Sequence, residues 1–333
     1  MNGTLLRFGR RIGPQLITLA VVVAMIAIVF PGFFDISVAN GRLYGSPIDI
    51  LNRGAPVALL AIGMTLVIAT GGIDLSVGAV MAICGAIAAT LISEGYGLPA
   101  TLALSLGAGL LCGLWNGLLV AVLGIQPIVA TLILMVAGRG IAQLVTEGMI
   151  RTFSHDGLAS LGSGNLLWLP TPVVIWLCAG ILATLVVRRT ALGMLIEAVG
   201  INRRASMLAG VNARLLLVTV YIVSGLCAAM AGIIVTADIR GADANNAGLF
   251  LELDAILAVV VGGTSLLGGH FSLIASLIGA MIIQAINTGI LVAGFPPEFN
   301  LVIKAAIVLA ILVLQSPALQ GAAMLFSRAK GQP

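Results

Sequence analysis

The sequence predicts an all-α polytopic membrane protein with about ten transmembrane helices in two inverted five-helix repeats. Hydrophobic residues fill 60% of the 333 positions and charged residues only 8%, whereas soluble domains carry about 25% charged residues. The long stretches are apolar on every face, which is typical of membrane helices and not of the alternating strands of a membrane β-barrel. A polar segment with a basic bias, residues 188–214, divides the chain near its middle.

Ten apolar stretches are expected to cross the bilayer. They lie at residues 16–34, 55–69, 77–92, 100–123, 127–145, 172–187, 215–237, 252–261, 273–292 and 301–314. We expect the first to be an uncleaved span, because it is long and no small-residue cleavage site follows it. The crossings are even in number, and basic residues gather in the N-terminal arm, the central segment and the tail. This bias predicts that both termini lie in the cytoplasm.

A break between helices is expected in each half. Paired glycines, Gly71 and Gly72, precede Asp74 and interrupt the second and third spans. The order of Asp74, an apolar helix and a glycine-rich helix with Asn116 is weakly echoed by Asp254, its helix and a helix with Asn287. The echo places repeat 1 at about residues 14–147 and repeat 2 at about 170–316 of one domain, 1–333. Inverted repeats with broken helices are a transporter architecture.

Polar side chains at these breaks and in the spans are candidates for a translocation pathway, because such groups are costly inside a bilayer and mark function there. The candidates are Asp74, Ser76, Asn116, Asn245, Asn246, Glu252 and Asp254. An alternative stays open for the three carboxylates, which could instead cap helix N-termini, where negative charge is favoured. Asn116, Asn245 and Asn246 are weaker candidates, because an asparagine in a tight contact between helices looks the same in sequence.

Several kinds of chemistry are not expected. The sequence has no GxxxxGK[ST] loop for ATP phosphates, no nucleophile with a histidine base, and no cysteine or histidine at metal-ligand spacing. We therefore expect no catalytic residue, no metal and no cofactor in this chain. The net charge of +4 reflects basic residues of cytoplasmic loops, so a nucleic-acid partner is not expected either.

The central segment is expected to form a short helix on the cytoplasmic surface, with Asn202 as its cap and Gly210 as its end.

A family resemblance is carried by three stretches, GGIDLSVGAVMAICGA (71–86), AVGINRRASMLAGVN (198–212) and ADIRGADANNAGLFLELDAILAVVVGGTSLLGG (237–269). Together they resemble the membrane permease of bacterial ABC-type sugar importers of the ribose and galactofuranose class. The resemblance covers nearly the whole chain. Residues 43–80 are especially similar to the galactofuranose importer's permease.

This resemblance implies a permease subunit that moves a monosaccharide, with galactofuranose favoured, across the bacterial inner membrane. It implies a cytoplasmic ATP-binding subunit that holds ATP and magnesium, a periplasmic sugar-binding protein, a second and non-identical permease, and membrane lipid as partners. It also implies a cytoplasmic coupling loop at 188–214. The residues expected to couple to the ATPase are Gly200, Asn202, Arg203, Ala205, Met207, Leu208 and Gly210.

Two alternatives stay open at this point. The first is a ribose- or xylose-type permease, of which the ribose type would work as two identical copies. The second is a proton- or sodium-coupled secondary carrier, which would use its intramembrane carboxylates instead of ATP. Neighbouring genes for an ATPase and a binding protein would distinguish the ABC permease from the secondary carrier. The sequence does not specify the sugar, because aromatic residues make up only 5% of it and few lie within the spans.

Overall fold

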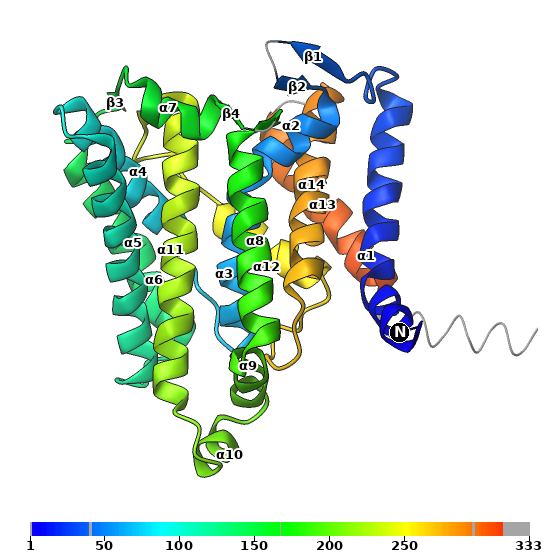
Figure 1. The fold of residues 1–333 in the computed structure, drawn as a ribbon, viewed down its shortest axis with the longest axis vertical. Helices are drawn as coiled ribbons and strands as arrows, with labels where there is room; N and C mark the ends of the chain where they lie inside the picture. The colour runs from blue at the N-terminus through cyan, green and yellow to red at the C-terminus, as the bar shows by residue number, and fades with distance from the viewer. Residues whose placement is uncertain (1, 40–41, 167, 295–296, 316–333) are drawn as a thin grey trace, which may run out of the picture.

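The computed structural model describes residues 2–39, 42–166, 168–294 and 297–315, and it is mostly helical (Figure 1). The helices are α1 (Asn2–Val29), α2 (Ser46–Arg53), α3 (Ala55–Ala69), α4 (Val77–Ser93), α5 (Leu98–Ala121), α6 (Pro127–Val145), α7 (Asp156–Ser163), α8 (Thr171–Arg189), α9 (Leu192–Ile201), α10 (Arg203–Leu208), α11 (Ala213–Ile239), α12 (Leu251–Val261), α13 (Leu273–Val292) and α14 (Pro297–Gln315). Short antiparallel pairs join β1 (Ser37–Ala39) to β2 (Arg42–Tyr44), β3 (Arg151–Thr152) to β6 (Gly241–Ala242), and β4 (Asn165–Leu166) to β5 (Leu169–Pro170).

Six of the described helices, α1, α5, α6, α8, α11 and α13, are long and apolar enough to cross a membrane. A seventh span is formed if α2 and α3, which are bent by 44°, count as one. Each of the ten predicted stretches coincides with a helix, but three helices fall short of the roughly 20 residues of a full span. They are α3 with 15 residues, which reaches that length only together with α2, α4 with 17 and α12 with 11. The predicted end of the first span at residue 34 is wrong. The helix ends at Val29 because Pro31 disfavours helical backbone before it.

The core is built around α11, which packs against α3, α4 and α5. Glycines allow this close approach, because a Cβ on Gly113 of α5 would collide with the Tyr221 carbonyl of α11, and one on Gly225 with the Gly109 carbonyl. The Tyr221 side chain of α11 is completely buried. The helix contacts of the two halves also correspond. In the first half α3 packs against α11, α12 and α13, and in the second half α11 packs in the same way against α3, α4 and α5.

The two ends of the helix bundle differ. Figure 1 places α9, α10 and the start of α1 at one end, and α2, α7 and the short strands at the other. The bundle therefore carries the central polar segment and the beginning of the chain on the same side.

Candidate functional site

The N-terminal ends of the two short helices, α4 and α12, meet inside the bundle. A Cβ on Gly78 would collide with the Gly248 carbonyl, and a Cβ on Gly248, whose φ is +71°, would collide with the Gly78 carbonyl. The Glu252 carboxylate of α12 also contacts Gly78, because its Oε2 lies 2.6 Å from the position that a Cβ on Gly78 would occupy. A carboxylate is stabilised at helix N-termini by their partial positive charge. The predicted helix breaks thus converge on one junction.

The first break, residues 70–76, is closed by Asp74, which is only 2% exposed. Its Oδ1 accepts hydrogen bonds from the backbone N–H of Ser76 at 3.0 Å and from the Ser76 hydroxyl at 2.6 Å. Its Oδ2 accepts one from the Ser224 hydroxyl of α11 at 2.8 Å. Asn116 of α5 donates its Nδ2 to the Ser76 Oγ at 2.8 Å. Three predicted candidates, Asp74, Ser76 and Asn116, therefore form one buried network that joins the break to α5 and α11.

The second break, residues 240–250, is tethered to α6 by two side chains one helical turn apart. Arg139 donates its Nη1 to the carbonyls of Ala244 at 3.0 Å and Ala247 at 2.6 Å. Gln143 donates its Nε2 to the Asn245 Oδ1 at 2.7 Å. Arg139 and Gln143 were not among the predicted site residues, although an arginine and a glutamine four positions apart within an apolar span are the signal that could have identified them.

Asp243 organises the turn that contains the two predicted asparagines. Its Oδ1 accepts from the backbone N–H groups of Asn245 at 3.0 Å and Asn246 at 3.3 Å, and its Oδ2 from the Asn246 Nδ2 at 2.7 Å. The side-chain bond from Asn246 and the backbone bonds hold the pKa of the Asp243 carboxyl below its usual value. Asn245 and Asn246 are exposed. These two candidates are therefore accessible from outside the chain, unlike Asp74.

Asp254 is separate from both networks and forms an ion pair. The Lys304 Nζ of α14 lies 2.9 Å from its Oδ1 and 3.0 Å from its Oδ2, and the two residues are 6% and 7% exposed. An opposite charge is the ordinary partner of an ionised side chain inside a membrane protein. Asp254 is thus joined to α14, a contact that the sequence analysis did not predict.

The central segment contains the short helix that was predicted, α10. The Asn202 Oδ1 accepts from the Ala205 N–H at 3.0 Å, and Gly210 follows the helix with a φ of +87°. The Arg203 Nη2 donates to the Ala121 carbonyl at the end of α5 at 3.3 Å. Leu208 is 91% exposed and Met207 45%. The capped helix is confirmed, and its coupling role stays a prediction.

Gly200 lies outside α10, in the last turn of α9, where a Cβ would collide with the Ala69 carbonyl of α3. It therefore allows α9 to pack closely against the end of α3.

Among the described residues, no group of three or more histidine, cysteine, aspartate or glutamate side chains could hold a metal ion.

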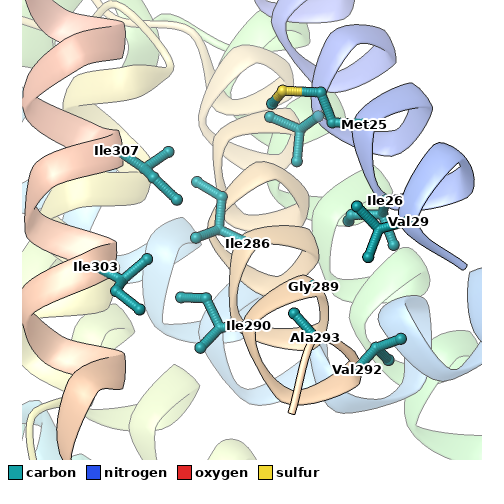
Figure 2. A pocket seen from close by; sticks show the side chains of 11 residues that line it. Met25, Ile26, Val29, Ile286, Gly289, Ile290, Val292, Ala293, Ile303 and Ile307 are labelled. Atoms are coloured by element: carbon teal, nitrogen blue, oxygen red, sulfur yellow. The ribbon is translucent and has the colours of Figure 1, made fainter. Parts of the chain in front are cut away.

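A pocket of about 190 Å³ lies between α1, α13 and α14. Figure 2 shows that its labelled side chains are hydrocarbon apart from the Met25 sulfur. Its lining residues are Val22, Met25, Ile26, Val29, Ile286, Gly289, Ile290, Val292, Ala293, Ile303 and Ile307. Such a lining offers no hydrogen bond to a hydroxyl group, so it does not fit a sugar.

Comparisons with known proteins agree with one another over most of the chain. Residues 46–312 match the family model described as branched-chain amino acid transport system / permease component. The chain is 64% identical to the galactofuranose transporter permease protein YtfT of Escherichia coli over 91% of this chain and 89% of that protein. It is 44% identical to the fructose import permease protein FruF of Bifidobacterium longum over 84% and 79% of the two chains. It is 37% identical to the ribose import permease protein RbsC of Escherichia coli over 90% and 92%. No solved structure matches the chain.

Proposed function

The chain belongs to the branched-chain amino acid transport system / permease component family, and on that premise we propose that it carries galactofuranose across the bacterial inner membrane as the permease subunit of an ATP-driven importer. The observation that carries this proposal is the 64% identity to a galactofuranose transporter permease over 91% of this chain. The fructose and ribose permeases are related at 44% and 37%. All three named relatives are sugar permeases, which favours a sugar over an amino acid as the cargo.

The hydrogen bonding of the buried carboxylates supports ATP as the energy source over a proton or sodium gradient. Asp254 is neutralised by Lys304, and Asp74 is surrounded by hydroxyl and N–H donors in a packed core. A carboxylate that carries protons or sodium must exchange its partner with water during each cycle. The two most buried carboxylates among the candidates have their partners within the chain, so a secondary carrier is the less favoured alternative.

The architecture proposed with this function has ten spans in two inverted repeats, about 14–147 and 170–316 of one permease domain, with both termini in the cytoplasm. The corresponding contacts of α3 and α11 support the repeat, and the common side of α10 and the start of α1 supports the orientation. In this arrangement Asn245, Asn246 and Glu252 line the sugar pathway at the junction of α4 and α12.

The partners are proposed from the same premise. A cytoplasmic subunit hydrolyses ATP and docks on residues 200–211, with Met207 and Leu208 as exposed anchors. A periplasmic protein captures the sugar, because a pathway that must release its cargo gains nothing from tight binding. A second, non-identical permease completes the pathway, as expected for a pseudo-twofold pair.

Uptake of radiolabelled galactofuranose tests the proposal. A bacterial strain without its own sugar importers would express this chain with the ATPase, the binding protein and the second permease. We expect uptake that depends on ATP hydrolysis, that exceeds ribose uptake, and that is lost when the second permease is omitted. Uptake of ribose alone, or uptake that persists with an inactive ATPase and follows the proton gradient, would contradict it.

A further inference from the structure

The two most exposed large apolar side chains of the described residues lie on a short helix and in a loop, not on the long helices. Leu208 of α10 is 91% exposed, and Leu267, in the link between α12 and α13, is 89% exposed. Single exposed leucines are common on protein surfaces. Two that are almost fully exposed, and that belong to segments which both contact α9, indicate a shared role.

The surroundings of Leu267 are polar. His270, three residues further on, has its Nδ1 3.1 Å from the Glu197 Oε2 of α9, and these side chains are 75% and 31% exposed. An exposed carboxylate and imidazole belong in water and not among lipid tails. The link therefore lies at the aqueous end of the bundle, where lipid does not cover an exposed leucine.

The link is joined to the element that carries α10. The Gly269 N–H donates to the Ala69 carbonyl at the end of α3 at 2.9 Å. A Cβ on Gly269 would lie 3.1 Å from the Cγ1 of Ile201, the last residue of α9, and Ile201 directly precedes Asn202, the cap of α10. Ile201 is itself 66% exposed. Ile201 thus belongs to α9, and Leu208 and Leu267 belong to two segments that each contact α9. We call these three residues the apolar end face.

We propose that Leu267 is a second docking contact for the ATP-hydrolysing subunit, beside α10 on the apolar end face, an inference that rests on the proposed function. The link connects α12 directly to α13. A partner that holds both α10 and Leu267 moves α12 together with the central segment. The movement of the partner then reaches the junction of α4 and α12 through α12, which is 11 residues long, instead of through α11, which is 27 residues long.

Site-specific photocrosslinking in the assembled transporter tests this contact. A benzoylphenylalanine residue is placed at position 267, at position 208, or at position 96, where Tyr96 is 51% exposed in the link between α4 and α5. We expect crosslinks to the ATPase subunit from 208 and 267 but not from 96. A crosslink from 208 without one from 267, or one from 267 only to lipid, to the second permease or to residues 316–333 of this chain, overturns the inference. Failure at both 208 and 267 instead overturns the proposed coupling role of α10.

Substitutions give an independent test. Leu267→Asp is expected to reduce sugar uptake more than tenfold while the amount of permease in the membrane and its melting temperature stay near those of the wild type. Leu267→Met, which keeps the apolar volume, is expected to recover most of that loss. Full uptake by Leu267→Asp would overturn the inference. If Leu267→Asp does not reach the membrane, the crosslinking result decides.

Discussion

At the break between α3 and α4, hydroxyl and N–H groups hold the carboxylate of Asp74, whereas at the break between α11 and α12 a basic side chain holds backbone carbonyls, and a second one holds a carboxylate in the helix that follows. The first network is formed by short side chains in a core of close helix contacts, and Asp74 is 2% exposed. Arg139 reaches from α6 to the second break, and Lys304 reaches from α14 to Asp254 in the first turns of α12. The asparagines of the second break are exposed.

The difference indicates that the two breaks have different roles. Short hydroxyl side chains lose little conformational freedom and fix the helices they join, so the first break is a rigid support. Long basic side chains can keep their bonds while the backbone shifts. We therefore propose that the second break provides the accessible surface of the pathway and moves during transport.

The largest expected effect comes from the Asp254 and Lys304 pair. Lys304→Met leaves a buried carboxylate without a partner, which typically costs about 3–5 kcal/mol. We expect a strongly reduced melting temperature of the purified permease and little uptake. The double variant Asp254→Leu with Lys304→Met removes both charges and is expected to recover most of the stability. A Lys304→Met variant as stable as the wild type would show that the pair does not hold α14.

A smaller effect is expected at the first break. Asp74→Ala removes the acceptor of the Ser76 N–H and of the Ser76 and Ser224 hydroxyls. The hydroxyls can rotate toward other acceptors, so the lasting cost is that of the unsatisfied Ser76 N–H, about 1–3 kcal/mol. Ser224→Ala removes one bond and is expected to cost about 1 kcal/mol. Thermal unfolding of the two variants measures these two losses of stability. Uptake per folded molecule should remain close to normal in Ser224→Ala, and a selective loss of uptake there would contradict the role of a rigid support.

How much of this arrangement could be predicted depends on the range of the interaction. Runs of apolar residues predicted a helix at each of the ten positions, and Asn202 and Gly210 predicted the ends of α10, because these signals are local. The partners of Asp254 and Asn245 are Lys304 and Gln143, which are 50 and 102 residues away. Only the packing of α14 and α6 brings them together. A single sequence carries no local signal for that.

The tether of the second break should affect transport more than folding. Arg139→Gln removes a charged donor to two carbonyls, and hydrogen bonds to charged groups contribute about 1.5–3 kcal/mol. We expect uptake to fall at least fivefold with a smaller fall in melting temperature than in Lys304→Met. Gln143→Ala, which removes one neutral bond at the same turn, serves as the milder control. A fall in uptake in Arg139→Gln no larger than its loss of folded permease explains would remove the proposed difference between the breaks.

The smallest effect is a pH dependence at Asp243. Its pKa in the folded chain is below the ordinary value of 3.8, so the carboxylate stabilises the turn above that pH, and this contribution is lost as the pH falls through the lowered pKa. We expect the difference in melting temperature between the wild type and Asp243→Asn to shrink as the pH is lowered from 7 toward 3. A difference that grows on acidification would have the wrong sign.

The accessibility of the two breaks to a water-soluble thiol reagent tests the central claim most directly. The four native cysteines are first replaced, and single cysteines are then introduced by Asn245→Cys, Asn246→Cys or Ser76→Cys. Asn245 and Asn246 are exposed, whereas Ser76 is 1% exposed. We predict rapid labelling at 245 and 246, slowed when the sugar is being transported, and no labelling at 76 in the folded transporter. Equal labelling rates at 76 and 245 would contradict the assignment of a rigid first break and an accessible second one.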